Sequence, residues 1–209
     1  MNLFAFFFFS FVSVLTIVNP VGGLITFVSL TSGMSETKKR EIAKRSVVIA
    51  CLLAVVFAIS GELLLRFFGI TVDSLRIAGG VLLFIVALNM VLAKPSPESI
   101  TEAEAEDAST REDISVFPIA MPLLTGPGTI TTVIVLIRTG KTVGLKIMDI
   151  LAILSVFALT YVVFRFADRV SQILGVTGSL LVSRIMGLLL ASIAVNFITV
   201  GISNIWGLQ

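Results

Sequence analysis

The chain of 209 residues contains no histidine, one cysteine, one tryptophan and one tyrosine, and 13% of its residues are charged. The absence of histidine excludes histidine metal sites, histidine-dependent nucleophiles and imidazole proton shuttles. The single cysteine, Cys51, excludes an intrachain disulfide, and its hydrophobic surroundings indicate a small core residue. Because a clustered pair of acids is also missing, we do not expect an enzyme.

Hydrophobic residues make up 56% of the chain, and the mean hydropathy is +1.08. This is too apolar for a soluble domain and predicts an all-α polytopic membrane protein embedded in a lipid bilayer. The net charge of +2 comes from clustered basic loops, so nucleic acid is not an expected partner. Six stretches reach the roughly 20 residues that span a bilayer. They lie at about residues 3–31, 44–66, 74–93, 114–138, 147–167 and 179–204.

The basic residues predict the orientation of the chain. Five Lys and Arg residues lie between positions 38 and 45, whereas both ends of the chain lack charged side chains. By the positive-inside rule, this first connection is cytoplasmic and both termini lie outside. Residues 94–113 contain two prolines and seven acids, which is the composition of a solvated linker. We therefore expect a three-helix repeat at 1–93, an acidic cytoplasmic linker at 94–113 and a second repeat at 114–209.

The two halves of the chain resemble each other at an offset of about 107 positions. Each half has three apolar stretches, an odd number, so the second half enters the membrane in the opposite direction. The sequence therefore predicts two inverted repeats, with a substrate site at their interface near the midplane. The matching segments are Pro20 with Pro127, Glu62 with Asp168, Gly69-Ile70-Thr71 with Gly175-Val176-Thr177, Arg76-Ile77-Ala78-Gly79 with Arg184-Ile185-Met186-Gly187, and Asn89 with Asn196.

Helix breakers interrupt the first and fourth apolar stretches. The first break is Asn19-Pro20-Val21-Gly22-Gly23, and the second break is Thr125-Gly126-Pro127-Gly128-Thr129. Proline removes an amide donor and releases the carbonyl four residues back, which belongs to Thr16 or to Leu123. Asn before Pro is typical of the cap and first turn of a new helix. We therefore predict that helices one and four are broken near the midplane.

The two new half-helices are expected to point their amino ends at each other. Helix amino ends attract anions, and glycine lets a ligand approach the backbone closely. The threonine hydroxyls can bind substrate, cap the half-helices or do both. The alternative is that both breaks are proline kinks that aid packing, because Gly and Pro are common in membrane helices. The predicted substrate-binding residues are Asn19, Pro20, Gly22, Gly23, Thr125, Gly126, Pro127, Gly128 and Thr129.

Two acids lie near the ends of the second and fifth stretches. Glu62 and Asp168 are candidates for coupling to a proton or another cation, because an ionisable group in a membrane is a functional candidate. The alternative is interfacial ion pairing. Arg66 lies four residues after Glu62, and Arg165 and Arg169 flank Asp168.

Two asparagines, Asn89 and Asn196, lie inside the third and sixth stretches. We expect each to hydrogen-bond to a neighbouring helix, with direct substrate contact as the alternative. No sequence pattern indicates a metal or an organic cofactor. A proton or a sodium ion is therefore the expected small partner besides the substrate.

Nearly the whole chain resembles the MarC family of integral membrane proteins, which includes the SnatA-type transporters of small neutral amino acids. The resemblance rests on Asn19-Pro20-Val21-Gly22, the basic loop, the acidic linker, Met121-Pro122-Leu123-Leu124-Thr125-Gly126-Pro127-Gly128-Thr129-Ile130, and Asn196. It implies a six-helix protein of the inner membrane with both termini outside. It also implies that glycine, alanine and similar amino acids are substrates. Their carboxylate would suit the helix amino ends, and their ammonium would meet the carbonyls of Thr16 and Leu123 or an asparagine oxygen.

The resulting hypothesis is a secondary transporter of small neutral amino acids that works by alternating access, one repeat moving against the other. A Walker-type nucleotide-binding loop is absent from the sequence, so a proton or sodium gradient or substrate exchange would drive transport. The main alternative is a channel or facilitator for a small polar solute or anion. Aquaporins also place Asn-Pro at facing half-helix ends, but in re-entrant loops. A non-transporting scaffold, in which the breaks are incidental, is the third alternative.

Overall fold

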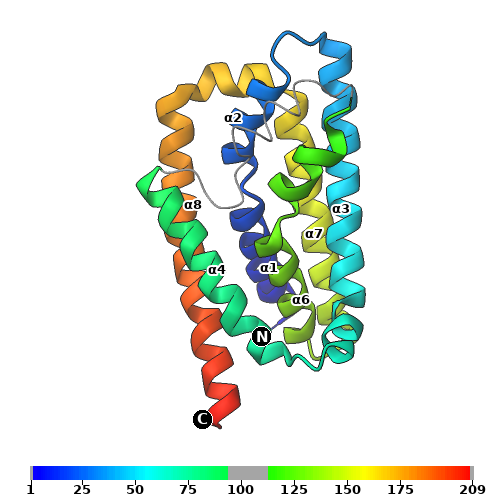
Figure 1. Cartoon of the computed structure of the whole chain (residues 1–209), viewed down its shortest axis with the longest axis vertical. Coiled ribbons are helices and arrows are strands. Elements are labelled where there is room, and N and C mark those ends of the chain that lie inside the picture. The colour runs from blue at the N-terminus through cyan, green and yellow to red at the C-terminus, as the bar shows by residue number, and fades with distance from the viewer. Residues whose placement is uncertain (1, 94–112, 208–209) are drawn as a thin grey trace.

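The computed structural model describes residues 2–93 and 113–207, and the regular structure within them is helical (Figure 1). Of the predicted acidic linker, all but Asp113 lies outside the described residues. The fold class is therefore all-helical, as the sequence predicts. The elements are α1 (Leu3–Val18), α2 (Pro20–Leu30), α3 (Glu36–Phe67), α4 (Val72–Leu92), the irregular segment η1 (Ser115–Leu124), α6 (Pro127–Thr139), α7 (Val143–Arg165) and α8 (Ala167–Trp206).

Five apolar spans in the described residues are long enough to cross a bilayer. They are α1 with α2, α3, α4, α7 and the Thr177–Trp206 part of α8. The segments η1 and α6 pass the same test as a pair that is bent by 59°, which makes a sixth span if the pair counts as one. The chain is therefore a multi-pass membrane protein.

Both ends of the chain lie toward the same end of the helix bundle, and the connection between α2 and α3 lies at the opposite end (Figure 1). This arrangement agrees with an even number of crossings. Which side of the membrane holds the termini stays a prediction from the basic residues.

Three long helices begin at a hydroxyl residue that accepts a hydrogen bond from the amide three residues later. These caps satisfy amides that the first helical turn leaves without a partner. The helices therefore begin where the polar connections end. The caps are Ser35 before α3, Thr71 before α4 and Thr142 before α7.

A glycine kink divides α8. Gly175 has φ 60° and ψ −178°, a conformation that other residues rarely adopt, and the helix continues from Thr177. The part before the kink runs across one end of the bundle before the chain turns to descend beside α4 (Figure 1). Asp168 lies in this crossing part, three residues after the end of α7 and outside the spans.

The helices pack mainly against helices of the other half of the chain. α1 packs on α7, α3 packs on α6 and α7, and α4 packs on α8. The buried apolar residues form two clusters. The larger one joins α1, α2, α3, η1, α6 and α7 with Ala167 at the start of α8. The smaller one is centred on α4 and the later part of α8, with Ile17 and Val135 contributed by α1 and α6. The two halves therefore interlock.

Glycines bring α4 and α8 into close contact. A Cβ atom at Gly80 would lie 2.9 Å from the carbonyl oxygen of Ala194, and one at Gly187 would lie 3.0 Å from the carbonyl oxygen of Ala87. Both glycines are buried. Small residues let membrane helices approach to backbone contact, which is the main source of packing energy between helices in lipid.

Gly80→Ala is expected to lower the thermal stability of the protein, because the added methyl group meets backbone. Such overpacking typically costs about 1–3 kcal/mol. Gly178→Ala is the matched control on α8, where a Cβ atom would lie 3.5 Å from its nearest neighbour, Leu174. Thermal unfolding of the detergent-solubilised protein measures the effect. A Gly80→Ala variant as stable as the control would contradict the close contact.

Candidate functional site

At the first break, a single residue separates two helices. α1 ends at Val18 and α2 starts at Pro20, and Asn19 between them has φ 44° and ψ 65°. Asparagine tolerates this left-handed conformation better than most residues. Its side-chain oxygen accepts a hydrogen bond from the Gly22 amide at 3.2 Å, and its carbonyl accepts one from the Gly23 amide at 2.9 Å. Asn19 is thus the cap and Pro20 the first residue of a new helix, as the sequence predicts.

These hydrogen bonds use two of the amides that the sequence offers to an anion. A Cβ atom at Gly22 would collide with the Asn19 side chain, so glycine at this position makes room for the cap. The amino end of α2 is therefore satisfied largely from within the chain. Binding of a substrate by these residues stays a prediction.

The second break is less regular on the side that precedes it. η1 winds in wide turns, and Phe117 and Met121 have extended backbone angles inside it. Each of these residues precedes a proline, which disfavours helical geometry at the residue before it. α6 then starts at Pro127, after Gly126, an N-cap residue that has no side chain with which to cap the helix.

Threonine hydroxyls hold the second break in place. Thr125 donates to the carbonyl of Ala50 on α3 at 3.0 Å, and Thr129 donates to the carbonyl of Leu124 at 3.1 Å. Leu124 directly follows Leu123, whose carbonyl the sequence expected to be released. Both threonines are buried. The Thr125 hydroxyl therefore ties the break to α3, and the Thr129 hydroxyl satisfies a carbonyl at the break. Substrate binding by these hydroxyls stays a prediction.

The structure brings the two breaks together in the interior. A Cβ atom at Gly23 would lie 4.0 Å from the Leu124 side chain and 3.4 Å from the ring of Phe164 on α7. The Phe164 ring stacks on Phe27 of α2, with the ring centroids 4.6 Å apart. Leu124, Phe164 and Phe27 are buried. The start of α2 thus lies beside the end of η1, just before the second break, within one apolar core.

Most residues predicted for the site lie in this interior. The buried ones are Thr16, Pro20, Gly23, Thr125, Gly126, Gly128 and Thr129. The half-buried ones are Asn19, Gly22 and Leu123, whereas Pro127 is exposed. The Thr16 hydroxyl donates to the Val12 carbonyl of its own helix at 2.6 Å.

The two asparagines lie away from the breaks. Asn89 is half-buried on α4, and Asn196 is exposed on α8. Within residues 2–93 and 113–207, neither side chain hydrogen-bonds to another helix. The expected helix-to-helix hydrogen bonds are therefore not present in this structure.

Both predicted coupling acids are in ion pairs. Glu62 pairs with Arg66 at 2.7 Å and also with Arg138 of α6. Asp168 pairs with Lys39 at the start of α3 at 3.0 Å, and not with either arginine that flanks it in sequence. A role of Glu62 or Asp168 in coupling stays a prediction.

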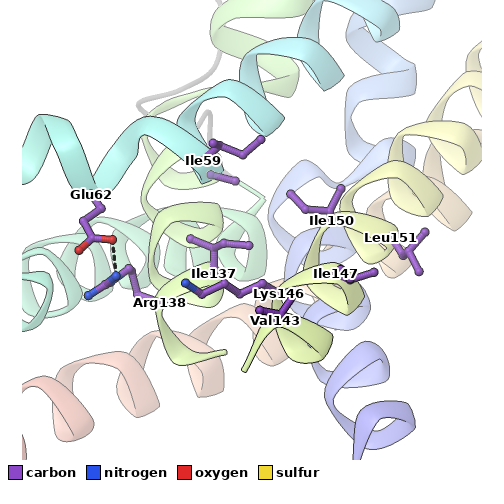
Figure 2. A pocket seen from close by; sticks show the side chains of 10 residues that line it. Ile59, Glu62, Ile137, Arg138, Val143, Lys146, Ile147, Ile150 and Leu151 are labelled. Atoms are coloured by element: carbon purple, nitrogen blue, oxygen red, sulfur yellow. Dashed lines mark hydrogen bonds and ion pairs between the residues drawn. The ribbon is translucent and has the colours of Figure 1, made fainter. Parts of the chain in front are cut away.

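A pocket of about 380 Å³ opens beside the Glu62–Arg138 pair, between α3, α6 and α7 (Figure 2). Its walls are mainly aliphatic, and its charged groups are Glu62, Arg138 and Lys146. Two of its lining residues, Ile59 and Val143, are 69% and 75% exposed, so the pocket opens to the outer surface of the helix bundle. No lining residue belongs to either break, so this pocket is distinct from the predicted substrate site.

Two buried polar side chains were not singled out by the sequence. Asp149 on α7 and Thr132 on α6 are 0% and 1% exposed. The Ser10 hydroxyl donates to one carboxylate oxygen of Asp149. In the described part of the chain, the other oxygen of Asp149 and the hydroxyl of Thr132 have no hydrogen-bond partner. An acid inside the fifth apolar stretch was the available signal for Asp149. Thr132, one of several threonines near the second break, offered none.

Known proteins resemble this chain over almost its full length. Residues 4–206 match the family of MarC family integral membrane proteins. A UPF0056 membrane protein of Methanocaldococcus jannaschii is 37% identical over 197 residues, which cover 94% of this chain and 96% of that protein. A UPF0056 membrane protein of Aquifex aeolicus is 39% identical over 196 residues, which cover 94% of this chain and 92% of that protein. The UPF0056 membrane protein YvbG of Bacillus subtilis is 32% identical over 205 residues, which cover 98% of this chain and 97% of that protein. No solved structure shows a significant match.

Asn19→Ala is expected to destabilise the protein by about 1 kcal/mol through loss of the cap, with further strain from the left-handed backbone at this residue. Asn19→Gly is the matched control, because glycine adopts this backbone freely and costs only a few tenths of a kcal/mol at a cap. Thermal unfolding of the solubilised variants compares them. Equal stability of the two variants would contradict the left-handed conformation.

Proposed function

Because the chain belongs to the MarC family of integral membrane proteins, we propose that it is a secondary transporter of small neutral amino acids such as glycine and alanine. The observation that carries the proposal is the meeting of two broken helices in the buried interior. Irregular backbone at membrane depth is tolerated where protein or a water-filled cavity surrounds it. In many transporters, such breaks surround the substrate.

Reciprocal packing of α4 and α8 supports inverted repeats. At an offset of 107 positions, Gly80 corresponds to Gly187 and Ala87 corresponds to Ala194. Gly80 faces Ala194 and Gly187 faces Ala87, so each contact has a counterpart with the halves exchanged. The two helices run antiparallel (Figure 1), as a two-fold axis in the membrane plane requires. In this alignment of the two halves, the counterpart of Gly187 is Gly80, and not Gly79 as in the sequence match above.

The start of α6 is the proposed site for the substrate carboxylate. This start lies in the buried interior, where Gly126, Gly128 and Thr129 are all buried. A helix amino end attracts a negative charge, and the effect is strong away from water. The buried Thr132 hydroxyl on the same helix has no partner in the described chain and can hydrogen-bond to the substrate. The ammonium would then meet the carbonyl of Thr16 or Leu123, which proline at the break removes from the helical pattern.

The packing suggests which helices move. Because the two halves interlock, moving one half against the other would separate the close contact between α4 and α8. The two buried clusters instead favour movement of α4 and α8 as a pair against the remaining helices. The second cluster reaches the remaining helices through Ile17 of α1 and Val135 of α6. This movement would open the region of the two breaks alternately to each side.

The protein reconstituted in liposomes that contain unlabelled alanine is expected to exchange it for labelled glycine or alanine. A carrier predicts saturable uptake that other small neutral amino acids inhibit competitively. Liposomes without protein provide the control. Flux that neither saturates nor responds to competitors would favour a channel, and absence of flux with folded protein would contradict transport of these substrates.

Thr132→Val is expected to raise the substrate concentration at half-maximal exchange roughly 2- to 10-fold, which is the effect of losing one hydrogen bond. The substitution preserves shape and removes a hydroxyl that has no hydrogen-bond partner among residues 2–93 and 113–207. Thr160→Val is the matched control, because Thr160 is buried on α7 with its hydroxyl bonded to the Val156 carbonyl at 2.8 Å. Equal half-saturation of both variants and the unchanged protein would contradict substrate binding by Thr132.

A further inference from the structure

Asp149 lies in the second turn of α7, fully buried against α1. The Ser10 hydroxyl of α1 donates to one of its carboxylate oxygens, and Ser10 is also fully buried. The second oxygen of Asp149 is buried with no partner in the described part of the chain. Asp149 is therefore an acid inside a membrane span, and within the described residues its carboxylate accepts a hydrogen bond from one neutral hydroxyl.

In the part of the chain that the structure describes, no charged group pairs with Asp149. α1 and α2 contain no charged side chain. Glu62 and Arg138 pair with each other beside the pocket, and Asp168 has its own ion pair. Among residues 2–93 and 113–207, none of the titratable groups near α7 bonds to Asp149. Those groups are Cys51 and Glu62 of α3, Arg138 of α6, Asp168 of α8, and Lys146 and Tyr161 of α7 itself.

The chemistry of this site suits a proton. An ionised carboxylate buried without a cation costs several kcal/mol, and protonation removes this cost. A metal cation would need several oxygen ligands, whereas the structure supplies the Asp149 carboxylate and the Ser10 hydroxyl. No cluster of three or more acids or cysteines that could hold a metal ion occurs in the described residues.

We propose that Asp149, positioned by Ser10, binds and releases the proton that drives transport. The inference rests on the proposed transport function and adds the coupling ion and its site. The carboxylate takes up one proton from water on one side of the membrane and returns it to water on the other side. No other reactant is consumed.

The location explains how the proton can influence the substrate site. Ser10 lies on α1 and Asn19 directly follows this helix, about 14 Å away along its axis. With Asp149 protonated, α1 and α7 stay packed as they are in this structure. Loss of the proton leaves a charge that requires water, which favours separation of α1 from α7. Movement of α1 is transmitted directly to the Asn19 cap at the first break.

Asp149→Asn, which fixes a neutral side chain of equal size, tests the inference in liposomes. The unchanged protein is expected to accumulate labelled alanine when a pH gradient is imposed, and Asp149→Asn is expected to lose this accumulation while exchange stays measurable. Asp73→Asn is the control, since Asp73 pairs with Arg76 at 2.7 Å at the start of α4. Unchanged accumulation by Asp149→Asn, or accumulation driven by sodium instead of protons, would overturn the inference. So would selective loss of accumulation in Glu62→Gln with Asp149→Asn unaffected.

A second measurement does not depend on transport. The infrared spectrum of the solubilised protein at neutral pH is expected to show the carbonyl stretching band of a protonated carboxylic acid. This band should vanish in Asp149→Asn and shift in Ser10→Ala. Absence of the band in the unchanged protein would overturn the inference even if exchange occurs. Absence of exchange with the band present would contradict the proposed function and leave proton binding supported.

Discussion

The structure depends on one constraint, which is that every backbone polar group inside a bilayer needs a partner from the protein. The chain breaks two of its apolar segments and then satisfies the exposed groups with its own side chains. Asn19 caps the start of α2, Thr129 bonds to the Leu124 carbonyl at the second break, and Thr125 bonds to the Ala50 carbonyl of α3. The start of α6 is buried, and the same helix carries the buried Thr132 hydroxyl, which has no hydrogen-bond partner among the described residues. This is the reason for proposing the substrate carboxylate at α6.

The same constraint shapes the packing. Lipid offers no hydrophobic driving force between helices, so close contact must come from small residues and from interlocking elements. Gly80 and Gly187 provide that contact between α4 and α8, and the other helices of each half pack into the opposite half. A second apolar cluster is centred on α4 and α8. This cluster is the basis for proposing that the two helices move together as a pair.

The sequence predicted the features that local patterns determine. The apolar stretches located the spans, and Asn19-Pro20 located the start of α2, because proline chemistry acts on its immediate neighbours. The sequence did not reveal the irregular course of η1, which depends on the residues before two prolines. It also did not reveal the crossing part of α8, which depends on the kink at Gly175. The isolation of Asp149 was also hidden, since the sequence does not show which helix faces an acid. The use of the Gly22 and Gly23 amides by Asn19 likewise required coordinates.

The central claim is that the two breaks form the binding site for a small amino acid. An experimental structure of the protein with alanine bound tests it most directly. The account predicts density for a zwitterion between residues 19–23 and 125–129, with its carboxylate at the start of α6 and within hydrogen-bond distance of Thr132. Density in the aliphatic pocket beside Glu62 and Arg138, with the region of the breaks closed by its own side chains, would contradict the account.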